Sequence, residues 1–255
     1  NAAVGGTTAL ASLTTNAGAS VSLLNVTTTG AQTHGAATTL NGTYTTGGAF
    51  TANGAATLGG DTTVNGGVAV LFAGTVDGAY ALAVNNKSTT QFTGTVGGTT
   101  ALASLTTDAA GTSSLRNVTT TGAQTYNDAV TLNGTYTTGG AFTANGAATL
   151  GGDTTVNGGV AVLFAGTVDG AYALAVNNKS TTQFTGTVGG TTALASLTTD
   201  AAGTSSLRNV TTTGAQTYND AVTLNGTYTT GGAFTANGAA TLGGDTTVNG
   251  GAAVL

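Results

Sequence analysis

The stretch NGTYTTGGAFTANGAATLGGDTTVNGG occupies residues 133–159, and it occurs again at residues 41–67 and 225–251. The three copies begin 92 residues apart, and every residue from 41 to 159 is matched 92 positions later. Self-similarity at a fixed long period is typical of repeat proteins, in which each unit packs against its neighbours. A catalytic site is one constellation in a unique pocket, so this repetition favours a structural or multivalent role.

The repeat divides the chain into four parts. Residues 1–40 form a partial, divergent repeat, 41–132 and 133–224 are full repeats, and 225–255 is a further partial repeat. We expect 1–255 to be a single continuous array. Because the chain begins and ends inside the pattern, we also expect it to be a piece of a longer polypeptide.

The composition predicts an all-β protein. Charged residues make up 5% of the chain, Gly accounts for 43 of 255 residues, and Pro, Cys, Met and Trp are absent. Thr, Val, Tyr and Phe favour strands, while Gly and Asn favour turns. The chain is 40% hydrophobic, which is more than a disordered low-complexity segment would contain.

Charge and hydropathy exclude several classes of function. Four Lys and Arg residues cannot form the basic surface that nucleic-acid binding needs. No apolar run approaches the length of a membrane-spanning helix. Without Cys, the chain has no disulfide and no thiolate chemistry.

A shorter period lies inside the 92-residue unit. From Asn133 the unit divides into five segments of about 18 residues each, most of which end in Thr followed by Leu or Val. Neighbouring side chains on a strand face opposite sides, so stacked segments would hold the aliphatic residue inside and the Thr outside. We expect Thr167 to point outward. One interior stack would contain Leu132, Leu150, Val168 and Val188.

Three short strands in about 18 residues make one coil of a parallel β-helix, or β-solenoid, with about 14 coils in all. Asn219 would lie over Asn237 in a hydrogen-bonded ladder. The alternative fold is a string of immunoglobulin-like β-sandwich repeats, whose usual size is close to this period. Corners with tight turns are expected at Asn133–Gly134, Asn145–Gly146, Gly151–Gly152 and Asp169–Gly170.

His34 is the only histidine, and its counterparts in the next two repeats are Tyr126 and Tyr218. An essential base or metal ligand would recur in each copy. We therefore interpret His34 as a corner or surface position that accepts either ring.

The Asp residues do not complete a calcium-binding repeat, because Gly151-Gly152-Asp153 lacks the rest of the motif. A polysaccharide-cleaving enzyme with paired Asp residues on neighbouring coils is the enzymatic alternative, but so few charges argue against it. We predict a non-enzymatic protein with no catalytic, cofactor-binding or metal-binding residue. The residues that we interpret as solvated corner charges are Asp153, Asp169, Asp200 and Asp220.

Three tracts resemble repeats of filamentous-haemagglutinin-like exoproteins, which are very large bacterial surface or secreted adhesins. They are FAGTVDGAYALAV at residues 72–84, FTGTVGGTTALASLTT at 92–107 and NVTTTGAQTYNDAVTL at 117–132. The resemblance implies a right-handed parallel β-helix shaft. It implies no ligand for this part of the chain, because the secretion domain and any binding tip of that family have no counterpart here.

The sequence thus predicts a structural shaft segment of a large secreted bacterial adhesin or extracellular matrix filament, located outside the cell or at its surface. The expected partners are further copies, side by side or end to end, and a host or matrix surface bound by other regions. The alternative function is a solenoid surface that binds ice or a polysaccharide.

Overall fold

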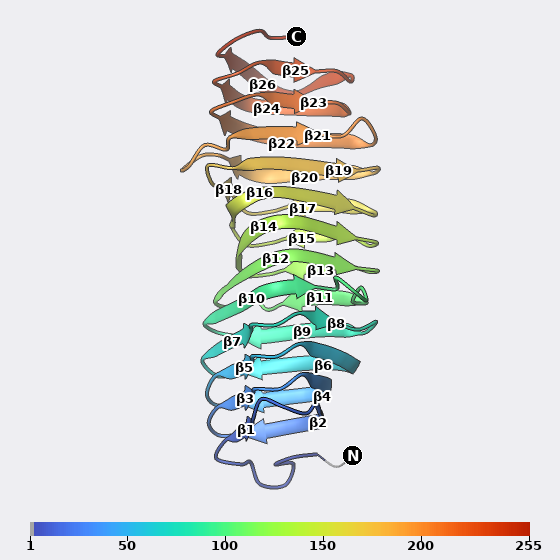
Figure 1. Ribbon diagram of the computed structural model, residues 1–255. Coiled ribbons are helices and arrows are strands. Elements are labelled where there is room, and N and C mark those ends of the chain that lie inside the picture. The colour runs from blue at the N-terminus through green and yellow to red at the C-terminus, as the bar shows by residue number, and fades with distance from the viewer. Residues whose placement is uncertain (1–2) are drawn as a thin grey trace. The chain divides into compact units, whose positions relative to one another are not determined.

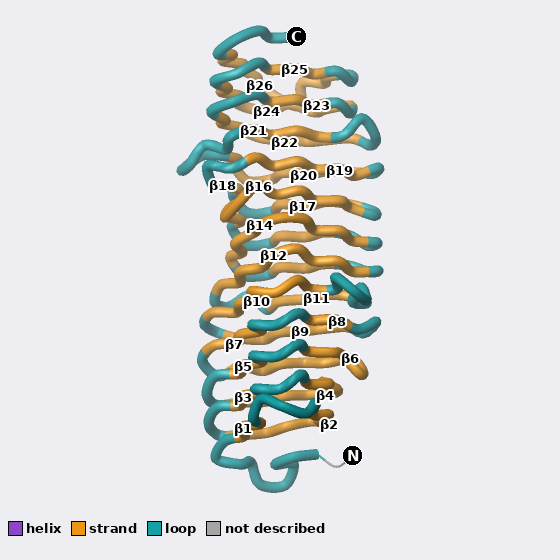
Figure 2. Tube along the Cα trace, viewed as in Figure 1, coloured by secondary structure: helices purple, strands orange, loops and turns teal. Residues whose placement is uncertain are grey.

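The computed structural model describes residues 3–255, so the first two residues of the partial repeat 1–40 lie outside the described residues. The described chain consists of strands and loops and contains no helix (Figure 2). No helix among these residues is therefore long and apolar enough to cross a membrane. The all-β prediction is confirmed.

The chain divides into two compact units, Asn1–Asp128 and Ala129–Leu255. Figure 1 labels the strands along both units. In the described part of the first unit the strands are β1 (Leu13–Thr15), β2 (Val21–Thr28), β3 (Gln32–His34), β4 (Thr38–Thr46), β5 (Phe50–Ala52), β6 (Ala56–Gly66), β7 (Ala69–Phe72), β8 (Val76–Asp77), β9 (Ala81–Asn86), β10 (Thr89–Val96), β11 (Ser104–Thr107), β12 (Thr112–Thr120) and β13 (Gln124–Tyr126). In the second unit they are β14 (Ala129–Thr138), β15 (Phe142–Ala144), β16 (Ala148–Gly158), β17 (Ala161–Phe164), β18 (Val168–Asp169), β19 (Ala173–Asn178), β20 (Thr181–Val188), β21 (Ser196–Thr199), β22 (Thr204–Thr212), β23 (Gln216–Tyr218), β24 (Ala221–Thr230), β25 (Phe234–Ala236) and β26 (Ala240–Gly250).

Within each unit, the strands pair in parallel with strands one coil earlier or later in the chain. In the first unit β4 pairs with β6 and β6 pairs with β9. In the second unit β16 pairs with β19, and β19 pairs with β21. Parallel pairing from coil to coil defines a β-solenoid. It rules out the immunoglobulin-like alternative, whose sheets are antiparallel.

The coils are on average longer than predicted. Leu132 lies opposite Leu150, as the predicted spacing requires. Val156, however, lies opposite Val176, and Val176 lies opposite Thr199. Both pairs are separated by more residues along the chain than Leu132 and Leu150 are. The described residues make about 12 turns of about 20 residues, and the prediction of 14 turns was wrong.

Part of the extra length comes from two glycines that were expected at a corner. Gly151 and Gly152 lie inside β16, where the pairing with β14 shifts from Leu132↔Leu150 to Gly134↔Thr154. The two glycines thus bulge out of the ladder and lengthen the coil. A Cβ on Gly152 would lie 2.6 Å from Oδ1 of Asn133, so any larger residue there would require the Asn133 side chain to move.

Of the other three expected corners, Asn133–Gly134 lies inside β14 opposite this same shift in pairing, whereas Asn145–Gly146 and Asp169–Gly170 lie at strand ends. Gly134 and Gly170 have φ angles of 89° and 129°, which favour glycine. Asn145–Gly146 forms the bend between β15 and β16. The predicted asparagine ladder is also confirmed, since Nδ2 of Asn237 donates to Oδ1 of Asn219 at 2.7 Å.

The expected interior stack is split into two. Val168 lies opposite Val188 on one side and Ala148 on the other, whereas Leu150 lies opposite Leu132. All four predicted residues are buried, but the coil here is longer than predicted, which moves Ala148 into the position assigned to Leu150. Thr167 is exposed, as predicted.

Aromatic rings fill a further interior stack in each unit. Phe72 and Phe92 lie parallel with ring centroids 4.9 Å apart, and Phe164 and Phe184 repeat this arrangement at 4.9 Å. The separation equals the usual distance between paired strands. Ring stacking therefore follows directly from the coil-to-coil register.

Residues 92 positions apart do not lie in the same stack. In the first unit Val26 and Val118 occupy different stacks, and in the second unit Tyr136 and Tyr228 do so. With about 20 residues per coil, one repeat is about 4.6 coils, which is not a whole number. Each repeat thus places the same sequence on a different face of the coil. The stack of Val26 contains Tyr44, Val64, Val84, Thr107 and Tyr126, and that of Val118 contains Val96, Val76, Ala56, Thr38 and Val21.

Replacing Val168 by Asp should destabilise the second unit by several kcal/mol, because the carboxylate would be buried without a partner. Urea unfolding followed by circular dichroism measures this loss. The matched control is Thr167→Ser on the exposed side of the same coil, which should change the unfolding free energy by less than about 0.5 kcal/mol. Equal effects of the two substitutions would contradict the assigned register.

Candidate functional site

A polar groove on the first unit is the best candidate for a binding site. It encloses about 400 Å³. Side chains from consecutive coils form it, because Thr45, Asn65 and Asn85 follow inward-facing residues of β4, β6 and β9 and so point outward. The groove is lined by Thr45, Thr46, Asn65, Gly66, Gly67, Asn85, Lys87 and Asp108.

The three outward side chains are joined by hydrogen bonds that run in one direction. Nδ2 of Asn85 donates to Oδ1 of Asn65 at 2.9 Å, and Nδ2 of Asn65 donates to Oγ1 of Thr45 at 3.3 Å. Oδ1 of Asn85 and the hydroxyl hydrogen of Thr45 are the two ends of this chain of bonds. The ladder therefore offers one acceptor and one donor to a ligand.

One positive and one negative charge flank the ladder. Lys87 follows β9, and Asp108 follows β11 on the next coil. Oδ1 of Asp108 accepts a hydrogen bond from the backbone N–H of Asn86 at 3.1 Å, which fixes the carboxylate at the groove. The lining residues have no net charge in sum.

The second unit contains the same groove residues at the same spacing. Nδ2 of Asn177 donates to Asn157 at 2.9 Å, and Nδ2 of Asn157 donates to Thr137 at 3.3 Å. The carboxylate of Asp200 accepts from the backbone N–H of Asn178 at 3.0 Å. Each unit thus carries its own ladder.

A second concavity of about 330 Å³ lies on the first unit over β5, β7, β10 and β12. Its outward residues Thr51, Leu71, Gln91 and Ser114 lie opposite one another on successive coils. It holds no charged residue and no hydrogen-bonded ladder. We therefore regard the polar groove as the stronger candidate.

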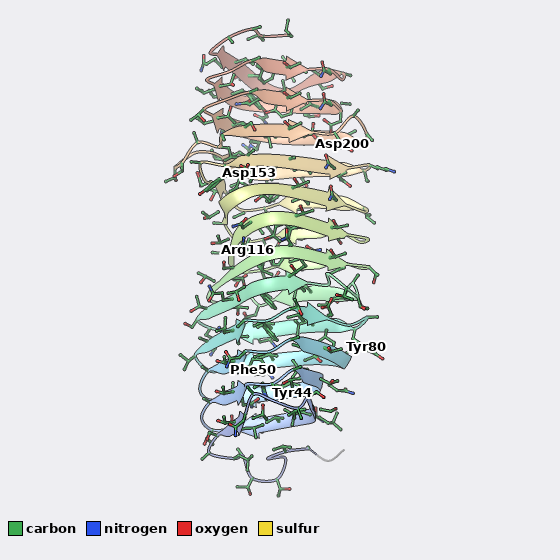
Figure 3. The ribbon with its side chains drawn as sticks, in the orientation of Figure 1. Tyr44, Phe50, Tyr80, Arg116, Asp153 and Asp200 are labelled. Atoms are coloured by element: carbon green, nitrogen blue, oxygen red, sulfur yellow. The ribbon has the colours of Figure 1, made fainter. Side chains whose placement is uncertain are left out.

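His34 does not lie at a corner or on the surface, and this prediction was wrong. Its ring is fully buried in β3, 5.1 Å from the ring of Phe50 and 6.3 Å from that of Tyr44. Figure 3 shows Tyr44 and Phe50 within the coils, in contrast to Tyr80, which lies in a peripheral loop. Side chains alternate between the two faces of a strand, and in β3 this alternation puts His34 on the inward face. Composition alone does not reveal which face a residue occupies.

The histidine leaves buried polar atoms without partners. Neither nitrogen of His34 forms a hydrogen bond, and Oε1 of Gln32 also has none. In the later copies the tyrosine hydroxyl donates to that glutamine oxygen, from Tyr126 to Gln124 at 3.2 Å and from Tyr218 to Gln216 at 3.1 Å. The first copy thus lacks an interior hydrogen bond that the other two have.

The substitution His34→Tyr should therefore stabilise the first unit by about 1–3 kcal/mol, because the new hydroxyl can donate to Gln32. Thermal and urea unfolding measure the change. The matched control is Tyr218→His, which should destabilise the second unit by a similar amount. A loss of stability in His34→Tyr would show that the first copy has no room for the phenol.

His34 should also make the first unit sensitive to acid. Burial lowers the pKa of His34 to about 4, whereas in the unfolded chain it is about 6.5. The unfolded state therefore takes up a proton first, and stability falls as pH drops from about 6.5 to about 4, by about 3 kcal/mol in all. Unfolding of wild type and His34→Tyr across this range should show the loss in wild type only; parallel profiles would contradict it.

The prediction of solvated Asp residues holds in part. Asp153 is exposed and Asp169 and Asp200 are half-buried, and all three accept backbone hydrogen bonds from a later or earlier coil. Asp220 differs, because it is buried and accepts from the hydroxyls of Thr199 and Ser205. The interpretation of Asp220 as a surface charge was wrong.

The first unit has the same buried cluster at Asp128. Its carboxylate accepts from Thr107 at 2.7 Å and from Ser113 at 2.5 Å. Burial raises the pKa of Asp128 above its ordinary value, while the two hydroxyl bonds oppose that rise. In the divergent repeat Asp128 and Ser113 are replaced by Ala36 and Val21. The polar pair is thus exchanged for an apolar pair.

The residues of this cluster should therefore depend on one another. Asp220→Ala alone leaves two buried hydroxyls without an acceptor, and Ser205→Val alone removes a donor from a buried carboxylate, so each should cost about 1–3 kcal/mol. The double variant copies the divergent repeat and should cost about 1–2 kcal/mol less than the sum. Urea unfolding of all four proteins completes this double-mutant cycle. Simple additivity would show that the pair is not coupled.

Among residues 3–255 there is no group of three or more His, Cys, Asp or Glu side chains that could hold a metal ion. The chemistry present is that of hydroxyls, amides and isolated charges. Such groups can bind a ligand by hydrogen bonding.

Comparison with known proteins found no matching family model, no similar curated protein and no similar solved structure. The resemblance to filamentous-haemagglutinin-like exoproteins therefore stays a prediction from sequence.

Proposed function

We propose that this chain is a non-catalytic shaft segment whose role is to provide stiff length. The observation that carries the proposal is that neither concavity is unique. The lining residues of both recur 92 positions further on, so the chain repeats its surfaces instead of concentrating function in one. Proteins that stack one unit on the next are suited to building length.

The hydrogen bonding within each unit supports a mechanical role. Backbone bonds run from coil to coil, for example along β4, β6 and β9, so a pull along that direction loads many bonds at once. Each coil gains its stability mainly from its neighbours. Further coils of the same sequence would add length without changing the local structure.

The wider setting of the shaft belongs to the same proposal. The resemblance to large exoproteins supports a secreted bacterial adhesin or an extracellular matrix filament, at the cell surface or beyond it. Regions outside residues 1–255 would contact a host or matrix surface. Side-by-side or end-to-end association of copies would thicken or extend the shaft.

Ice binding has weaker support. An ice-binding surface needs unbroken rows of Thr, but the outward row Thr43, Thr63 and Ala83 is interrupted at its third coil. The neighbouring row changes from Thr45 to Asn65 and Asn85. A thermal hysteresis assay distinguishes such a surface from a plain shaft.

Deletion of residues 41–132 tests the shaft proposal. Both cut ends then meet the sequence that they met before, so coil pairing should be kept and the melting temperature should change little. If the coils continue in one shaft, the maximum dimension from small-angle X-ray scattering should fall by about 22 Å, since one repeat makes about 4.6 coils of ~4.8 Å each.

The control is deletion of residues 41–86, half a repeat, which brings corners over strands and should destabilise the protein strongly. Unchanged maximum dimension in the 41–132 deletion would contradict a shaft, whatever the fate of the control.

A further inference from the structure

We propose that the polar groove of each unit binds a neutral polysaccharide through the hydroxyl groups of consecutive sugars. In the first unit the site consists of the ladder Thr45, Asn65 and Asn85 with Lys87 and Asp108 beside it. Binding of a polysaccharide would be a function in addition to the mechanical role of the shaft, because the repeated surface would then have its own ligand.

The groove presents unused hydrogen-bonding capacity at its ends. Within the ladder each amide N–H that is bonded points toward the preceding coil, so Oδ1 of Asn85 and the hydroxyl hydrogen of Thr45 are left for a ligand. Asp108 has one oxygen engaged with the backbone of Asn86, and its other oxygen can accept. A vicinal pair of sugar hydroxyls can donate to one such oxygen and accept from an amide at the same time.

The lining residues argue against other classes of ligand. One ammonium beside one carboxylate gives no net attraction for a phosphate or sulfate polymer, which needs several cations. The groove contains neither an aromatic nor a large aliphatic side chain, so an apolar ligand would bury little surface. A ligand with many uncharged donors and acceptors is the class that remains.

The spacing of the ladder favours a polymer over a single sugar. Outward side chains on successive coils lie ~4.8 Å apart, so the groups from Thr45 to Asp108 extend over several coils. A chain of sugars can contact several of them at once. The same residues recur as Thr137, Asn157, Asn177, Lys179 and Asp200, so the second unit carries a second copy of the site.

The fold separates this site from the interior. The ladder residues point outward and contribute nothing to the interior stacks, whose residues alternate with them along β4, β6 and β9. Substituting them should therefore leave the coils intact. Binding and folding can be tested separately.

The test uses the intact chain with three soluble probes: dextran, a mannan and a mixed-linkage β-glucan. Affinity gel electrophoresis and calorimetry measure binding. We expect at least one polysaccharide to bind. The quadruple variant with Asn65, Asn85, Asn157 and Asn177 each replaced by Ala should bind it about tenfold or more weakly, with unchanged circular dichroism.

The matched control replaces four outward threonines elsewhere on the coils by Ala, namely Thr39, Thr57, Thr131 and Thr149. It should bind within about twofold of wild type. A variant altered only at Asn157 and Asn177 should keep the affinity of the first unit's groove and show about half the number of binding sites in calorimetry.

Three outcomes would overturn the proposal. The first is no binding of any of the three neutral polysaccharides. The second is equal loss of binding in the control and in the groove variant. The third is binding confined to a polyanion such as heparin, lost on replacing Lys87 and Lys179 by Ala. None of these outcomes would affect the shaft test, which measures length and stability.

Discussion

Parallel hydrogen bonding between each coil and the next determines nearly everything else in this structure. Once β4 is paired with β6 and β6 with β9, each residue has a fixed neighbour one coil away and a fixed side, inward or outward. Inward positions then become columns of like residues, such as Val64 over Val84, and outward positions become ladders, such as Asn65 over Asn85. The register of the backbone pairing, and not the side chains themselves, determines which side chains are neighbours.

The corners must allow this register to continue, and asparagine and glycine do so in partnership. Asn25 and Asn209 have φ angles of 46° and 44°, a conformation that asparagine tolerates better than most residues. In each case the side-chain oxygen accepts the backbone N–H of a threonine on the next coil, at 2.7 and 2.8 Å. A Cβ on Gly42 or Gly226 would lie 2.2–2.3 Å from that oxygen, so the following corner must be glycine. The corner residue of one coil thus determines which residue can occupy the corner of the next coil.

The sequence predicted the class of fold because periodicity and composition are global signals. The strands, the parallel coils and the outward position of Thr167 follow from them. Coil length was missed because Gly151-Gly152 has the composition of a corner, and only its pairing shows that it is a bulge inside β16. The burial of His34 and Asp220 was missed for a different reason. Shifting a strand by one residue exchanges its two faces, so a lone polar residue cannot be placed without the register. The groove was missed too, because its residues lie on different coils and are far apart along the chain.

The mismatch between the repeat and the coil has a consequence for how such a sequence can vary. Val26 and Val118 are equivalent residues of successive copies, and they lie in different stacks. A given residue of the repeat therefore does not occupy the same face of the coil in every copy. Each coil instead packs against the coil about 20 residues away, which for most of a repeat belongs to the same copy. Interior changes are matched only in part: Val21 and Ala36 together replace Ser113 and Asp128, but Thr15, the counterpart of Thr107, keeps a hydroxyl that has no hydrogen-bond partner. His34 is a second unmatched change, since Gln32 is unchanged and its side-chain oxygen is left without a donor. By this argument, stability is set locally by coil-to-coil matching, and the number of repeats is free to vary.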